Sequence, residues 1–75
     1  MNFQAALDHM QLGRKVQRAG WNGKHMFIEI VDDAIFEEPS TRLEPFIVMF
    51  TAQQTWVPWL ASQTDLLAED WGLFE

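Results

Sequence analysis

The sequence predicts a small α+β domain with an N-terminal helix, an antiparallel sheet of four to five strands and a short helix before the last strand. Three observations predict this fold class. Apolar residues recur at helical spacing near the N-terminus, two short segments are apolar on both faces, and a helix-start motif precedes the C-terminal segment. The chain has 75 residues, and we expect a single domain over residues 1–75.

The N-terminal half is predicted to contain a helix and two strands. Residues 14–18 form a short strand, and residues 19–23 form a turn with a hairpin signal at Asn22 and Gly23. Residues 26–31 form a second strand, apolar on both faces except at Glu29. The preceding helix is indicated by four apolar residues at i, i+3, i+4 and i+7 and by a following glycine: Phe3, Ala6, Leu7, Met10 and Gly13.

Residues 32–44 are predicted to form an exposed loop, because they carry five acidic residues and a proline. The loop is long for so small a domain, which makes it a candidate for function. Residues 46–51 form another strand that is apolar on both faces. A turn then leads into a strand at residues 55–57, where Pro58 limits further pairing.

The C-terminal segment begins with a helix-start motif. Ser62 is the expected N-cap, and Asp65 stands where a capping box has its acidic residue. A short helix is expected there, and residues 71–74 form the last strand. The same helix start makes Ser62, Thr64 and Asp65 candidates for ribose or phosphate contacts, although plain capping explains two of the three.

Composition predicts self-association. The sequence is 48% hydrophobic, with four Trp and six Phe, and it has no Cys for a stabilising disulfide. Two strands that are apolar on both faces need more cover than the two predicted helices provide. We therefore expect the uncovered sheet face to meet another copy of the chain in a homo-oligomer.

The charge distribution favours a small anionic ligand. A net charge of −6 argues against nucleic acid polymers and anionic membranes as partners. Four of the five basic residues, Arg14, Lys15, Arg18 and Lys24, nevertheless fall within eleven residues. A local basic region suits a small anion, but composition alone favours ordinary solvated charges.

With neither a signal peptide nor a run near the ~20 apolar residues of a membrane span, we expect a cytoplasmic protein.

Aromatic residues form the second set of binding candidates, because flat rings stack on nucleobases. Core packing is the favoured interpretation for Phe27 and Trp56, which lie within strands. Trp21 lies in a glycine-flanked turn and Trp71 at the end of an element, where large aromatic residues are exposed more often than within a strand. For these two residues, ligand contact and core packing are equally favoured interpretations.

Catalysis finds little support in the sequence. His9 and His25 are isolated, and no nucleophile motif, metal-ligand spacing or phosphate-binding glycine loop occurs. We therefore expect no catalytic residue, metal or cofactor. The acidic residues Asp65, Glu69 and Asp70 leave a hydrolase open as the least favoured alternative.

Much of the chain resembles one known family, the second type of phage Thoeris anti-defence sponge. The most specific match is the fifteen-residue block from Val57 to Trp71. Further matching segments are residues 1–3, 5–7, 13–16, 18–24, 26–28, 45–49 and 51–52, so that the resemblance covers the chain apart from residues 31–44.

The resemblance implies a homotetramer without enzymatic activity that acts in the cytoplasm of an infected bacterium. Members of this family capture the cyclic ADP-ribose isomer of Thoeris in pockets shared between two protomers, and some also hold CBASS-type cyclic dinucleotides at separate sites. By motif, Trp21 would stack on the base, Asp70 and Trp71 would close the pocket, and Arg18 and Lys24 would offset phosphate charge. The full set of candidate ligand-binding residues is Arg18, Trp21, Asn22, Gly23, Lys24, Phe27, Ser62, Thr64, Asp65, Asp70 and Trp71. The alternative from another class is an acidic protein–protein inhibitor of a host defence enzyme, supported by the acidic loop over residues 31–44.

Overall fold

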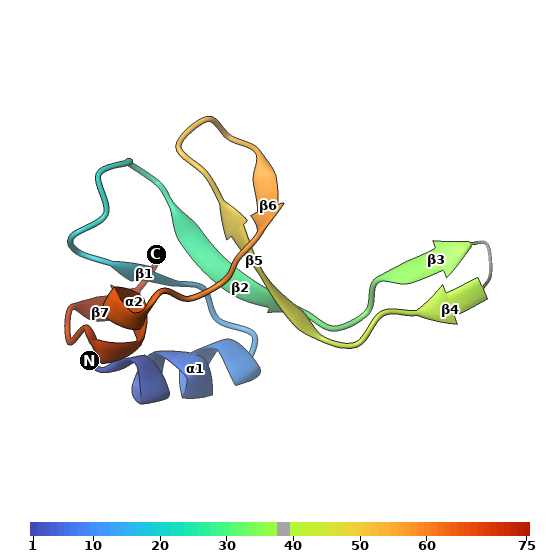
Figure 1. The fold of residues 1–75 in the computed structure, drawn as a ribbon, viewed down its shortest axis with the longest axis horizontal. Coiled ribbons are helices and arrows are strands. Elements are labelled where there is room, and N and C mark those ends of the chain that lie inside the picture. Colours follow the sequence, from blue (N-terminus) through green and yellow to red (C-terminus); the bar gives the residue numbers. More distant parts are fainter. Residues whose placement is uncertain (38–39) are drawn as a thin grey trace.

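The computed structural model describes residues 1–37 and 40–75. It confirms the α+β class, with an N-terminal helix, a five-stranded antiparallel sheet and a short C-terminal helix (Figure 1). The elements in chain order are α1 (Phe3–Gln11), β1 (Val16–Arg18), β2 (Phe27–Val31), β3 (Ile35–Glu37), β4 (Ser40–Arg42), β5 (Phe46–Phe50), β6 (Trp56–Pro58), α2 (Gln63–Leu67) and β7 (Trp71–Leu73).

The five-stranded sheet has the order β6-β5-β2-β1-β7, and all its neighbours are antiparallel. Its centre is the pair β2–β5, which runs from Phe27 opposite Phe50 to Val31 opposite Phe46. Strands β6 and β7 form the two edges. Pro58 lies on the edge strand β6, a position where a residue without a backbone N–H costs no ladder bond.

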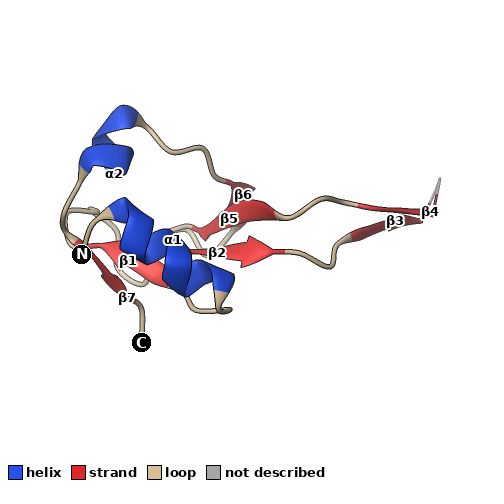
Figure 2. Ribbon diagram, turned by 90° about the horizontal axis from the view of Figure 1, so that it is seen from below, coloured by secondary structure: helices blue, strands red, loops and turns tan. Residues whose placement is uncertain are grey.

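Helix α1 covers one face of the sheet (Figure 2). The Asn2 side chain caps it by accepting from the Ala5 amide at 2.9 Å, and Gly13 follows its end at a φ of 85°, in the left-handed region that favours glycine. The buried core lies between this helix and the strands. It consists of Ala6, Met10, Val16, Ile28 and Trp71, each at most 3% exposed.

The opposite sheet face is lined by aromatic side chains. Because side chains alternate along a strand, Phe27 points away from the face that Ile28 shares with α1. The Phe27 ring stacks on Phe50 at 5.4 Å and contacts Trp56 and Phe74. We call Phe27, Phe50, Trp56 and Phe74 the aromatic face. Trp56, expected in the core, is 52% exposed because it lies on an edge strand of this uncovered face.

The prediction of a loop over residues 32–44 is wrong. Strands β3 and β4 pair with each other, with Ile35 opposite Arg42, and form a two-stranded arm that extends the molecule to 40 Å along its longest axis (Figure 1). The pairing continues that of β2 and β5, and the Leu43 amide donates to the Ala34 carbonyl at 2.8 Å. The loop was predicted from the five acidic residues of this segment, and its acidic composition does not show that part of it can pair as strands. Pro39 lies outside the described residues.

Among the described residues, neither helix is long and apolar enough to cross a membrane.

Candidate ligand-binding site

Arg18 joins two of the predicted acidic candidates. It lies at the end of β1, with Nη1 2.8 Å from the Asp65 carboxylate and Nε 2.9 Å from the Asp70 carboxylate. The side chains of Arg18, Asp65 and Asp70 are 17%, 14% and 34% exposed. We call these three residues the ion-pair cluster. It connects the end of β1 to α2 and to the start of β7.

Asp65 is held from both carboxylate oxygens. Oδ1 accepts from Arg18, whereas Oδ2 accepts from the Ser62 amide at 3.0 Å and the Ser62 hydroxyl at 2.8 Å. The Asp65 amide donates back to the Ser62 hydroxyl at 3.1 Å, which completes a capping box. The predicted helix start is confirmed. Capping thus engages both Ser62 and Asp65, and the neighbouring Thr64 is exposed.

Asp70 holds the turn that follows β1. Its Oδ2 accepts from the Gly20 amide at 2.9 Å, and its backbone carbonyl accepts from the Ala19 amide at 3.1 Å. A Cβ on Gly20 would lie 3.1 Å from the Asp70 Oδ2 atom, so the turn passes close to this carboxylate. Gly20 was not among the predicted site residues, because a backbone donor leaves no mark in a side-chain pattern.

These contacts lower the pKa of both carboxyl groups. For Asp70 the largest cause is the hydrogen bond from Arg18, which favours the ionised form. Burial alone raises the pKa of Asp65, but the bonds from the Ser62 amide, from Arg18 and from the Ser62 hydroxyl together outweigh it and hold that pKa below 3.8. The same two carboxylates raise the pKa of Arg18. The cluster is therefore fully ionised at neutral pH, and its formal charges sum to one negative.

Trp21 and Trp71 meet beside the cluster. Their rings pack edge to face, with centroids 5.5 Å apart at 83°. Trp71 is 3% exposed, and its Nε1 donates to the Asp65 carbonyl at 3.0 Å. Exposure of Trp71 at an element end was therefore a wrong expectation, because the rings of Phe3, Trp21 and Trp59 surround it. Trp21 is only partly buried, so part of its ring remains accessible.

The remaining loop candidates differ in their surroundings. Asn22 and Lys24 are exposed on the loop between β1 and β2. A Cβ on Gly23 would collide with the Met26 side chain and with Ala52 in the turn between β5 and β6. Close packing of two loops is therefore sufficient reason for a glycine at this position. Phe27 lies on the aromatic face, 6% exposed, and is not brought together with Trp21 and the ion-pair cluster.

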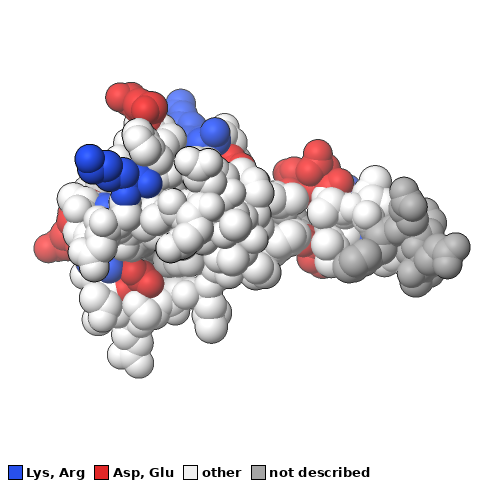
Figure 3. All heavy atoms as spheres, turned by 90° about the horizontal axis from the view of Figure 1, so that it is seen from above, with Lys and Arg blue, Asp and Glu red and all other residues white. Residues whose placement is uncertain are grey.

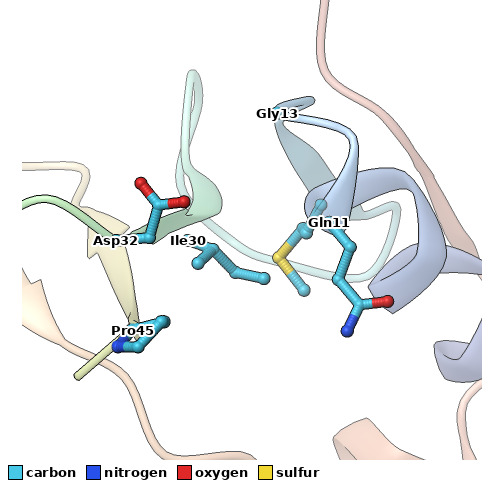
Figure 4. Close-up of a pocket in the computed structure, with 6 residues that line it drawn as sticks. Gln11, Gly13, Ile30, Asp32 and Pro45 are labelled. Carbon is cyan, nitrogen blue, oxygen red and sulfur yellow. The ribbon is translucent and has the colours of Figure 1, made fainter.

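Two hollows in the described surface lie away from these candidates. One has a volume of about 300 Å³ beneath the end of α1, where Figure 4 shows Asp32 and Gln11 on either side of Ile30. The other, of about 350 Å³, is lined by Arg14, Lys15 and the C-terminal residues. Neither hollow is lined by a predicted ligand-binding residue. The candidate site in a single protomer is thus a surface centred on Trp21.

Charged side chains are divided between the body and the arm. In Figure 3 most Lys and Arg side chains visible from this side lie on the body, and Asp and Glu side chains lie both on the body and at the base of the arm. His9, expected to be solvated, lies with Nδ1 2.8 Å from an Arg14 nitrogen.

Within residues 1–37 and 40–75, no three His, Cys, Asp or Glu side chains are grouped so that they could hold a metal ion.

Fold and site together describe a small α+β domain with a paired-tryptophan surface supported by an ion-pair cluster. The family model of the Thoeris anti-defense 2-like domain matches residues 1–74. A relative from Bacillus phage SP01, named Thoeris anti-defense 2, is 37% identical over 83 aligned positions, which cover 97% of this chain and 93% of the relative. The chain belongs to the Thoeris anti-defense 2-like family, which confirms the resemblance found in the sequence and supports a role in phage anti-defence.

Proposed function

We propose that this chain is a non-enzymatic protein that binds and sequesters the cyclic ADP-ribose-type signal of the Thoeris system, so that its effector is not activated. The observation that carries the proposal is the partly exposed Trp21 ring, held against the buried Trp71 in a chain of this family. An ADP-ribose signal contains an adenine base, which stacks on an indole for about 1–3 kcal/mol.

The groups around Trp21 supply polar contacts. Asn22 and Lys24 are exposed on the same loop, and Lys24 offsets the charge of the ligand's phosphates. Thr64 offers an exposed hydroxyl at the start of α2. Ser62, Asp65 and Asp70 bind one another or Arg18 and the turn, so we assign them to holding the site rather than to contacting ribose.

The state of the carboxylates supports binding without chemistry. A general base needs a pKa near the working pH and an oxygen free to accept a proton. The pKa values of Asp65 and Asp70 are lowered, and each of their four carboxylate oxygens accepts a hydrogen bond. Sequestration requires only a complementary pocket with slow release.

A closed pocket is proposed to require a second protomer. The Trp21 surface borders neither of the two hollows, whereas apolar side chains such as Leu60 and Leu67 are 92% and 80% exposed. We assign the aromatic face and these leucines to contacts in a homotetramer, with the ligand held between two protomers in the cytoplasm of the infected bacterium. Cyclic dinucleotides are a second ligand class, proposed to bind at separate sites.

Calorimetric titration with the Thoeris cyclic ADP-ribose isomer tests the proposal. We expect saturable binding, and we expect mass spectrometry to recover the nucleotide intact after long incubation with Mg²⁺ and release by heat. Recovery of a linearised nucleotide would replace the sponge with a hydrolase.

A protein–protein inhibitor is the second candidate, favoured by the projecting arm. The arm carries exposed Ile35 and Thr41, and Asp32, Asp33 and Glu44 lie at its base. Binding of no cyclic nucleotide, together with capture of a Thoeris protein by the wild-type chain but not by an I35E variant, would select this function.

A further inference from the structure

We infer that Arg18 is a positioning residue for the Trp21 ring and not a phosphate-binding cation. The inference rests on the proposed function, because it assigns Trp21 as the ring that stacks on the ligand's base. It reverses the role that a basic residue beside an aromatic turn suggests.

The charge balance of the ion-pair cluster argues against a phosphate contact. Arg18 contributes one positive charge and Asp65 and Asp70 contribute two negative charges, so the cluster as a whole repels an anion. The Arg18 side chain is 17% exposed, and its Nε and Nη1 atoms each bind a different carboxylate. Turning this guanidinium toward a ligand would leave two largely covered carboxylates without their partner, which is costly.

The hydrogen bonds of the cluster lead instead to the turn that carries Trp21. Asp70 accepts from the Gly20 amide through its side chain and from the Ala19 amide through its carbonyl, and the Trp21 amide donates to the Arg18 carbonyl at 3.3 Å. Arg18 fixes the Asp70 carboxylate from the other side at 2.9 Å. The backbone at Ala19 and Gly20, directly before Trp21, is thereby tied to the residue that precedes β7, and Trp21 is tied back to Arg18.

The second ring is tied to the same cluster. Trp71 follows Asp70 directly, and its Nε1 donates to the carbonyl of Asp65, whose side chain binds Arg18. Both indoles of the edge-to-face pair are thus attached to residues that Arg18 holds in register. Loss of Arg18 is expected to let the Trp21 turn move relative to Trp71, which removes the preorganisation of the stacking surface.

A double-mutant cycle with the Thoeris cyclic ADP-ribose isomer separates positioning from direct contact. At 1–3 kcal/mol per stacked base, W21A should weaken binding by about 5- to 150-fold. We expect R18M to weaken it by about fivefold in the wild-type background and by less than about twofold in the W21A background. Additive effects of R18M and W21A would show that Arg18 contacts the ligand independently and would overturn the inference.

Salt dependence supplies a readout that a positioning role does not move. K24M removes one positive charge from the exposed loop and serves as the matched control for R18M. We expect K24M to flatten the dependence of affinity on NaCl concentration, and we expect R18M/D70N, which keeps the charge of the cluster at one negative, to leave it unchanged. A flattened slope in R18M/D70N equal to that in K24M would make Arg18 a phosphate contact.

A spectroscopic measurement tests the inference without any ligand. The part of the near-ultraviolet circular dichroism that W21A removes reports the Trp21–Trp71 pair. We expect R18M to remove most of the same signal, and G20A, which crowds the Asp70 carboxylate without changing charge, to reduce it. An unchanged spectrum in folded R18M and G20A would overturn the inference even if the chain bound no nucleotide. If R18M does not fold, R18K and D70N enter the same measurements.

Discussion

The two faces of the sheet differ in how much of their apolar surface is buried within one protomer. On the face covered by α1, Val16 and Ile28 are fully buried and Trp71 is 3% exposed. On the aromatic face, Phe27 and Val48 are 6% and 8% exposed, with the rings of Phe50 and Trp56 packed against Phe27, and Trp56 remains 52% exposed. The covered face is therefore stable within one protomer, whereas the aromatic face has large apolar side chains still in contact with water.

The largest expected effect lies on the covered face. W71A should lower the free energy of unfolding by about 3–5 kcal/mol, because it leaves a cavity among Phe3, Trp21 and Trp59. W71F, which keeps a ring but loses the bond to the Asp65 carbonyl, should cost about 1 kcal/mol. Urea unfolding at several protein concentrations gives both values. Costs that change with concentration would place Trp71 at an interface instead.

On the aromatic face, a substitution should change the assembly of the protein and leave the folding of each protomer nearly intact. W56E places a charge on the half-exposed edge strand, where a single protomer tolerates it but an apolar contact between copies does not. We expect light scattering on a sizing column to show a smaller species than wild type, with near-native circular dichroism. A wild-type chain that already elutes as a monomer, or a W56E variant of unchanged mass, would remove the aromatic face from the proposed assembly.

Low pH should lower the stability of the folded chain, because it protonates Asp65 and Asp70 in the ion-pair cluster. The pKa values of Asp65 and Asp70 are lowered in the folded chain, so their contribution to stability is fully present above the ordinary value of 3.8 and is lost as the pH falls through the lowered values. We expect the melting temperature to fall below about pH 4, and to fall less steeply in the double variant D65N/D70N. The exposed D33N variant, on the arm side, is the control and should keep the wild-type profile. An identical profile in D65N/D70N would mean that other carboxylates cause the acid loss.

Local signals in the sequence were sufficient for the covered side of the fold. The spacing of Phe3, Ala6 and Met10 predicted α1, and the Ser62–Asp65 motif predicted the capping box, because both depend on residues within one or two helical turns. The arm was missed because its pairing follows from the register of β2 and β5, which the acidic composition of residues 32–44 does not reveal.

The candidate site was predicted only in part, for a similar reason. Trp21 was selected by its place in a glycine-flanked turn, and the structure leaves its ring partly accessible. The pairing of Arg18 with Asp65 and Asp70 spans 47 and 52 residues, so no spacing rule relates them. Each residue taken alone suggested a ligand contact, and their pairing with one another became evident only when the fold brought them together.

The smallest expected effect concerns the turn between β5 and β6, at the edge of the aromatic face. Gln54 has a φ of 64°, a left-handed conformation that costs a residue with a Cβ roughly 1–2 kcal/mol. Glycine removes this strain but loses about 0.5–1 kcal/mol through the greater freedom of the unfolded chain. We therefore expect Q54G to raise the free energy of unfolding by about 0.5 kcal/mol in urea titrations. The neighbouring Q53G, at a position without a positive φ, should instead lower it by a similar amount. Equal losses in both variants would show that the turn relaxes freely and that the edge of the aromatic face stores no backbone strain.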